Sequence, residues 1–252
     1  MRIFGSVLFL VALGLDASAE QRLPGSAFMG RSSQEMQRDD SLNPGMLWVK
    51  EGEVLWSRKA GTSARSCASC HGDAQSSMRG VAARYPVRSA AHGTLINLSQ
   101  RINLCRQERQ GTTPFALESE ELLGLESYIA LQSRGMSVAP LEDPNLQPFQ
   151  ERGRQRWYQR IGQLNLSCAQ CHDDNWGRRL GSSVIPQAHV GGYPAYRLEW
   201  QGMGSLHRRL RNCMTGVRAT PFSLGSQELT ELELYLTLRS KGMPMEAPGV
   251  RP

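Results

Sequence analysis

The sequence contains no apolar run long enough to span a bilayer. Ile3 to Leu15 is apolar apart from Gly and Ser, but it is shorter than the ~20 residues that a transmembrane helix needs. Basic clusters with interleaved aromatic residues are also absent, so we expect no nucleic-acid partner. No segment alternates polar and apolar residues as a strand would. These absences favour an all-α protein with no membrane span in its mature chain.

The first residues have the features of an export signal. Arg2 gives a positive start, the apolar run follows, and Ala17-Ser18-Ala19 is a typical small-residue cleavage site. We therefore predict a signal peptide over residues 1–19, with an uncleaved anchor as the alternative. Export implies that the mature protein works outside the cytoplasm, in the periplasm.

Length and composition leave room for two domains. The chain has 252 residues, 40% hydrophobic and 21% charged, which suits a globular protein of two units of about 100 residues each. The net charge is +6 and the pI is near 9.2. This charge fits general solubility or attraction to an anion or acidic partner, and alone it does not choose between them.

Four of the six cysteines lie in two C-x-x-C-H motifs. The motifs are Cys67-Ala68-Ser69-Cys70-His71 and Cys168-Ala169-Gln170-Cys171-His172. This spacing is typical of c-type haem, because two thiols bond to the haem vinyl groups and the adjacent histidine ligates the iron. We therefore predict two covalent haem c groups, with His71 and His172 as axial ligands. A four-cysteine zinc site or a redox dithiol is the alternative.

An internal repeat surrounds the two motifs. Residues 52–71 align without gaps with 153–172, and residues 113–136 align with 220–243 with 14 of 24 identical. Apolar residues at helical spacing follow Ser119 and Ser226, which we expect to be helix N-caps. The repeat predicts two tandem cytochrome c-like domains related by duplication. Their expected limits are residues 46–140 and 151–252, with a linker at 141–150 and an N-terminal extension at 20–45.

The second axial ligand should occur in both repeats. Met136 with Met243 is one shared pair, and Cys105 with Cys213 is the other, each cysteine lying 20 residues after a matching Tyr-Pro. Packing explains the methionines adequately. A free thiol outside the cytoplasm is oxidised unless it is protected, and coordination would protect it. A Cys105–Cys213 disulfide is the alternative. A disulfide needs its two Cα atoms within about 7 Å, and we do not expect equivalent positions of two separate units to lie so close together.

Cys213 has a strongly basic neighbourhood. Three arginines lie within His207–Cys213, and in a helix Arg209 would share a face with Cys213. An arginine there can lower the thiol pKa and bind an oxyanion. Cys105 has Arg101 at the same offset. Pairing with haem propionates or a solvated helix face is the alternative for these arginines.

Taken together, these residues resemble the SoxA subunits of the SoxAX cytochromes of bacterial thiosulfate oxidation. The resemblance rests on the two haem motifs, the two later cysteines and Arg209-Leu210-Arg211-Asn212-Cys213, and it covers nearly all of the mature chain. It implies an L-cysteine S-thiosulfotransferase that acts with a SoxX-type cytochrome subunit and joins thiosulfate to a cysteine of a SoxYZ-type carrier protein.

The resemblance also assigns roles to residues. It implies axial iron ligation by His71 with Cys105 and by His172 with Cys213. It makes Cys213 the catalytic residue, which can carry a persulfide, and Arg209 the substrate-binding arginine. The competing functions are a periplasmic dihaem electron carrier ligated by the methionine pair, a dihaem peroxidase, and a redox or gas sensor.

Overall fold

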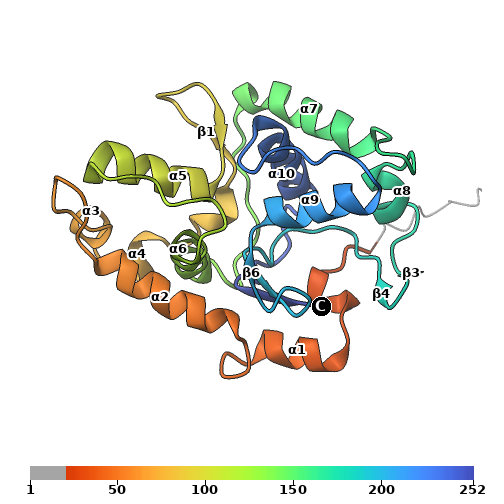
Figure 1. Ribbon diagram of the computed structural model, residues 1–252, viewed down its shortest axis with the longest axis horizontal. Helices are drawn as coiled ribbons and strands as arrows, with labels where there is room; N and C mark the ends of the chain where they lie inside the picture. The colour runs from red at the N-terminus through yellow and green to blue at the C-terminus, as the bar shows by residue number, and fades with distance from the viewer. Residues whose placement is uncertain (1–20) are drawn as a thin grey trace, which may run out of the picture.

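The computed structural model describes residues 21–252. The predicted signal peptide lies outside the described residues. The described chain folds into two mainly helical units that lie side by side, each with one C-x-x-C-H motif (Figure 1). No helix between residues 21 and 252 combines the length and apolar character needed to cross a membrane.

The four helices of the repeat occur in the same order in both units, and the N-terminal unit has additional short helices. The N-terminal unit contains α2 (Gly45–Ser57), α3 (Ala68–His71), α4 (Ala74–Ser77), η2 (Ala82–Arg84), β1 (Val87–Arg88), β2 (Leu95–Ile96), α5 (Leu98–Cys105), the π-helical η3 (Arg106–Gln110) and α6 (Glu120–Leu131). The C-terminal unit contains η4 (Pro144–Leu146), α7 (Gln147–Tyr158), α8 (Cys168–His172), β3 (Arg179–Leu180), β4 (Ser183–Val184), β5 (Ala195–Arg197), β6 (Gly202–Gly204), α9 (Leu206–Gly216), α10 (Gln227–Arg239) and β7 (Gly249–Arg251).

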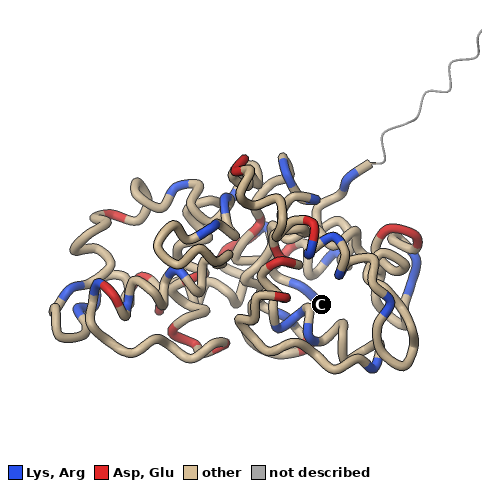
Figure 2. Tube along the Cα trace, turned by 90° about the horizontal axis from the view of Figure 1, so that it is seen from above, with Lys and Arg blue, Asp and Glu red and all other residues tan. Residues whose placement is uncertain are grey.

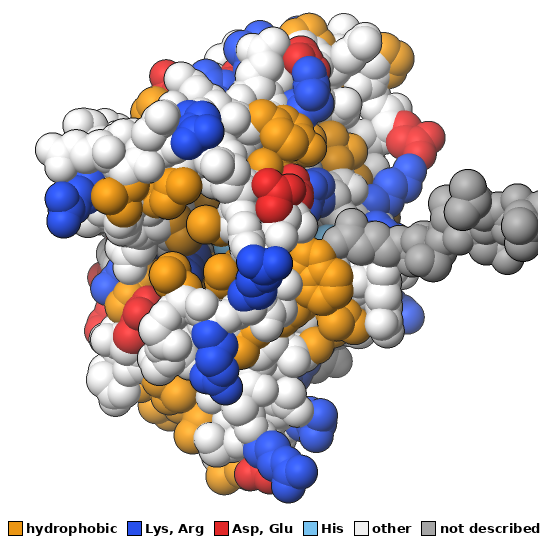
Figure 3. Space-filling view, turned by 90° about the vertical axis from the view of Figure 1, so that its right-hand side faces the viewer, with side chains coloured by type: hydrophobic (Ala, Val, Ile, Leu, Met, Phe, Trp, Pro, Cys, Tyr) orange, Lys and Arg blue, Asp and Glu red, His pale blue; other side chains and the backbone are white. Residues whose placement is uncertain are grey.

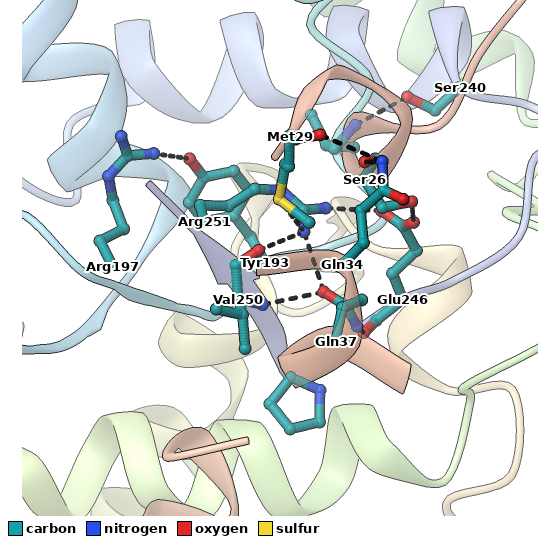
Figure 4. A network of polar contacts seen from close by, with 12 residues as sticks. Ser26, Met29, Gln34, Gln37, Tyr193, Arg197, Ser240, Glu246, Val250 and Arg251 are labelled. Carbon is teal, nitrogen blue, oxygen red and sulfur yellow. Dashed lines mark hydrogen bonds and ion pairs between the residues drawn. The ribbon is translucent and has the colours of Figure 1, made fainter. Parts of the chain in front are cut away.

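Residues 21–45 form an arm that packs on the C-terminal unit. The arm contains η1 (Gly25–Phe28) and α1 (Arg31–Arg38). Gln37 Oε1 accepts hydrogen bonds from Val250 N at 2.8 Å and from Arg251 Nη1 at 2.9 Å. Arg251 Nη2 also pairs with Glu246 at 2.5 Å (Figure 4). These contacts tie the arm to the last strand of the chain.

A glycine at the same place in each repeat lets the two long helices of each unit touch. A Cβ on Gly52 in α2 would lie 2.1 Å from the carbonyl oxygen of Gly124 in α6, and one on Gly153 in α7 would lie 2.2 Å from that of Glu231 in α10. Atoms cannot approach so closely, so glycine is required at both crossings. The matched crossings explain why these two glycines recur in the repeat.

The helices that follow begin as predicted. The side chain of Ser119 accepts a hydrogen bond from Leu122 N, and that of Ser226 accepts one from Leu229 N. α6 ends four residues before Gly135 and α10 ends three residues before Gly242, and both glycines have positive φ. Tight turns such as Ser133 N to Ala130 O at 2.9 Å replace the last helical turn.

The expectation of a chain without strands is wrong. β1 and β2 form a two-stranded sheet, as do β3 and β4, and β5 lies between β6 and β7. β5 runs antiparallel to β6, with Ala195 opposite Gly204, and parallel to β7, with Ala195 opposite Gly249. Each strand has only two or three residues, too few to produce a recognisable alternation.

Each unit has its own hydrophobic core, and a smaller cluster joins them. Trp56 is buried in the first core and Trp157 in the second. Between the units, Val138 N donates to Met243 O at 2.8 Å, and Met245 N donates to Met136 O at 2.8 Å. Charged residues of both signs are interspersed along the whole trace (Figure 2), so the net charge is spread over both units.

Candidate functional site

The C-x-x-C-H motifs form the short helices α3 and α8. Ser167 caps α8: its Oγ accepts from Gln170 N at 3.2 Å, and Gln170 Oε1 accepts from Ser167 N at 2.9 Å. This capping box fixes the first turn, and one helical turn places both cysteines of a motif beside the following histidine. All six cysteines of the chain are free thiols in the structure.

A tryptophan packs beside the histidine of each motif. The ring centroids of Trp56 and His71 are 5.8 Å apart, and those of Trp157 and His172 are 5.7 Å apart. Trp157 Nε1 also donates to Asp173 Oδ2 at 2.8 Å. The aligned tryptophans therefore position the imidazoles in the same way in both units.

His172 is oriented as an iron ligand requires. Its Nδ1 lies 2.6 Å from the carbonyl oxygen of Pro186, and since a carbonyl only accepts, Nδ1 carries the proton. That hydrogen bond orients the ring and leaves Nε2 as the nitrogen that can face Cys213 or, with haem bound, ligate iron. His172 is half-buried, whereas His71 is exposed. The residues of the C-terminal unit therefore fit haem c.

Cys213 lies against His172 near the middle of α9. Ser205 begins this helix by accepting from Arg208 N at 3.2 Å. Burial raises the pKa of the Cys213 thiol, but the hydrogen bond with His172 and the charge of Arg209 outweigh burial, so the pKa is lower than usual. These contacts stabilise the thiolate relative to that of an ordinary cysteine, and the thiolate is the form that binds metals and attacks sulfur.

Arg209 lies one helical turn before Cys213. Its Nη1 is 3.7 Å from Glu199 Oε1. Burial would lower the pKa of Arg209, but Cys213 and Tyr193 outweigh burial and raise it. The structure therefore brings together His172, Arg209 and Cys213.

The N-terminal unit has a related but different site. The negative charge of Cys105 contributes to raising the pKa of Cys67, and that of Cys70 contributes to raising the pKa of Cys105. These three thiols are therefore neighbours. Burial raises the pKa of Cys105, Arg101 opposes this shift, and Glu108 adds to it. The net pKa of Cys105 is raised, in contrast to that of Cys213.

The alternatives for the cysteines gain no support from the geometry. Cys105 lies with the first motif and Cys213 with the second, so the two thiols do not pair. Among residues 21–252 no group of three or more His, Cys, Asp or Glu side chains has the arrangement of a metal site. Met136 and Met243 lie in the segments that join the units.

The sequence reasoning did not find Pro186 or Arg197. Pro186 acts through its backbone, which no motif marks. Arg197 lies on β5, is buried, and exerts its charge on Cys213. The alignment of the repeats could have drawn attention to it, because the matching residue of the first repeat is Ser89.

Comparisons with known proteins identify the family of the chain. The family model described as "SoxA/TsdA, cytochrome c domain" matches twice, over residues 51–138 and 152–245. The L-cysteine S-thiosulfotransferase subunit SoxA of Pseudaminobacter salicylatoxidans is 40% identical over 92% of this chain and 82% of its own length. The subunit of the same name from Rhodovulum sulfidophilum is 36% identical over 90% of this chain and 79% of its own.

A solved structure is similar over the same extent. The crystal structure of SoxXA from P. pantotrophus contains a chain that superposes with a TM-score of 0.88 and 35% sequence identity, covering 92% of this chain and 87% of that one. The two matches to one cytochrome c domain confirm the predicted duplication. The chain therefore belongs to the SoxA/TsdA cytochrome c family, which carries haem c, and within it to the SoxA subunits of L-cysteine S-thiosulfotransferase.

Proposed function

We propose that this chain is the catalytic dihaem subunit of a SoxAX-type cytochrome. It joins thiosulfate oxidatively to a cysteine of a SoxYZ-type carrier and acts in a heterodimer with a SoxX-type cytochrome subunit. One observation carries the proposal: the Cys213 thiol lies within hydrogen-bonding reach of His172 and one helical turn from the guanidinium-bearing Arg209. The names of the relatives support the reaction, and the predicted export signal supports a periplasmic location.

Two haem c groups would be held by the two units. Cys67 and Cys70 would attach the first, with His71 and Cys105 as axial ligands. The second would be attached and ligated by the equivalent residues, Cys168, Cys171, His172 and Cys213. We assign the units to residues 46–140 and 151–252. Bound haem c supplies one-electron acceptors within the protein.

The residues around Cys213 then perform the reaction in two steps. Arg209 draws in the thiosulfate dianion and neutralises part of its charge. The thiolate of Cys213 and the outer sulfur of thiosulfate form a sulfur–sulfur bond, giving Cys213–S–S–SO₃⁻. This oxidation removes two electrons, which bound haem c would accept one at a time. The carrier thiolate next attacks the sulfur that bears the sulfonate, which restores the Cys213 thiolate. Atoms and charge balance in both steps.

The test is the Cys213→Ala variant in a reconstituted complex with its partner and carrier. Thiosulfate-dependent reduction of the cytochrome and formation of the carrier S-thiosulfonate should both fall to background. Unchanged turnover would reject the covalent role of Cys213. The ferric spectrum provides a second check, because a band near about 695 nm would indicate His/Met ligation and a plain electron carrier.

A further inference from the structure

A second arginine lies beside the proposed substrate site. Arg197 is at the end of β5 and only 8% of its surface is exposed. Its Nη1 donates to the hydroxyl of Tyr193 at 3.5 Å (Figure 4), and its guanidinium lies 5.1 Å from the ring centroid of Trp200. These neighbours hold the planar group in one orientation.

Arg197 and Arg209 share one carboxylate. Glu199 Oε1 lies 2.8 Å from Arg197 Nε and 3.7 Å from Arg209 Nη1. The two arginines come from different elements, β5 and α9, so their charges converge only through the fold. Both also act on the Cys213 thiol. An oxygen anion therefore already occupies the space between two guanidinium groups next to the reactive sulfur.

The side chain of Glu199 is more exposed to water than those of the two arginines. Its side chain is 45% exposed, against 10% for Arg197 and 34% for Arg209. An exposed carboxylate gains little from an ion pair because water screens and solvates it. Glu199 can therefore rotate into water at small cost, while Arg197 stays in place because it is buried and contacts Tyr193 and Trp200.

The N-terminal repeat lacks this arrangement. Tyr85, Arg101 and Cys105 correspond to Tyr193, Arg209 and Cys213 and likewise lie together. The paired strands match in register, with Val87 opposite Ile96 and Ala195 opposite Gly204. On that register Ser89 and Ala91 replace Arg197 and Glu199. The second arginine and its carboxylate therefore belong only to the unit proposed to react with thiosulfate.

We propose that Arg197 and Arg209 together bind the sulfonate end of thiosulfate, and that Glu199 occupies this site until substrate displaces it. This proposal rests on the proposed function and identifies the residues that select its substrate. Two converging guanidinium groups match a dianion with three oxygens on one sulfur. Binding of those oxygens directs the outer sulfur toward Cys213. Sulfide, which has no oxygens, gains nothing from the pair.

The test measures thiosulfate saturation in the haem-loaded complex. For Arg197→Ala we expect KM to rise roughly 10- to 100-fold, because a charge-assisted hydrogen bond is lost, with kcat within about three-fold. Arg197→Lys should restore part of the affinity. Inhibition by sulfate, a non-reacting tetrahedral dianion, should weaken in Arg197→Ala as KM for thiosulfate rises. Glu199→Gln should lower KM by roughly 3- to 10-fold, since the amide competes less for the arginines.

Arg154 and Glu151 provide matched controls. They form another Arg–Glu pair, at 2.8 Å on the exposed surface of α7, so Arg154→Ala and Glu151→Gln should leave KM unchanged. An unaltered KM in Arg197→Ala, or a higher KM in Glu199→Gln, would overturn the proposal. A shifted haem spectrum with unaltered KM in Arg197→Ala would instead assign this arginine to haem binding, which also overturns it. If Arg209→Ala has no effect either, the proposed function itself fails.

Discussion

The thiol of Cys213 and the imidazole of His172 lie within hydrogen-bonding reach of each other. They come from different helices, α9 and α8, and a different contact positions each of them. Pro186 fixes His172 through a 2.6 Å hydrogen bond, and the helix begun by Ser205 carries Cys213. The fold thus places a candidate metal ligand next to a candidate nucleophile. On the face around α8, β3 and β4, basic side chains lie beside hydrophobic ones (Figure 3).

Cys213→Ser tests whether sulfur is needed as the reacting atom. The hydroxyl keeps nearly the same size but is a much weaker nucleophile and iron ligand at neutral pH. We expect turnover to fall by at least about 10³-fold, with the melting temperature little changed. Steady-state assays and thermal denaturation measure these two properties. Retention of a tenth of the activity would contradict a covalent role.

Glu126 predicts a pH dependence of stability. It lines the cavity between the units together with His207 and Glu233. Burial raises the pKa of Glu126 from 4.5 to about 8, with Ser99 opposing the rise and Glu233 and Glu118 adding to it. The unfolded chain releases this proton near pH 4.5 and the folded chain near pH 8. The free energy of unfolding should therefore fall between these values and level off above them.

Glu126→Gln isolates this contribution. The neutral amide does not titrate, so the free energy of unfolding should fall less between pH 5 and pH 8 in the variant, by on the order of 2 kcal/mol. This figure is smaller than the full pKa shift implies, because the carboxyl is only partly buried. Urea unfolding at both pH values measures the difference. An identical pH slope in variant and parent would show that Glu126 titrates normally.

Gly153→Ala tests the helix crossing of the C-terminal unit. The added methyl would lie 2.2 Å from the Glu231 carbonyl oxygen, which is part of a helix backbone and cannot move aside. We expect α7 and α10 to separate, at a cost of about 2–4 kcal/mol in the free energy of unfolding. Gly216→Ala is the control, because no atom lies within 4 Å of its new methyl. Equal stability of the two variants would refute the close contact.

Gln187→Ala tests the link between the arm and the segment that contains Pro186. Gln187 is buried, its Oε1 accepts from Leu23 N at 2.7 Å, and its Nε2 donates to Gln21 O at 2.9 Å. It directly follows Pro186, which orients His172. Loss of both hydrogen bonds should destabilise the protein by about 1–3 kcal/mol and expose the arm to protease. Gln163→Ala, at an exposed position, should do neither.

The sequence predicted those parts of the molecule that repeat or obey a fixed spacing. The haem motifs, the duplicated helices and the caps at Ser119 and Ser226 follow from local rules. Arg209 and Cys213 could be paired because one helical turn separates them. The duplication is confirmed by the two matches to one family model.

The remaining features depend on contacts between distant segments. β5 pairs with β7, more than 50 positions later, as the register of Ala195 with Gly249 shows. Arg197 meets Arg209 only because that sheet lies beside α9. The arm was left without a role because its partners, such as Arg251, are at the other end of the chain. No local pattern encodes such pairings.

The most direct test of a covalent role for Cys213 is the mass of its peptide. The oxidised complex is mixed with thiosulfate in the absence of carrier, quenched with acid and digested. The account predicts that the peptide containing Cys213 gains one S₂O₃ group and loses it when the carrier is added. A peptide that stays unmodified while the cytochrome is reduced by thiosulfate would contradict the account.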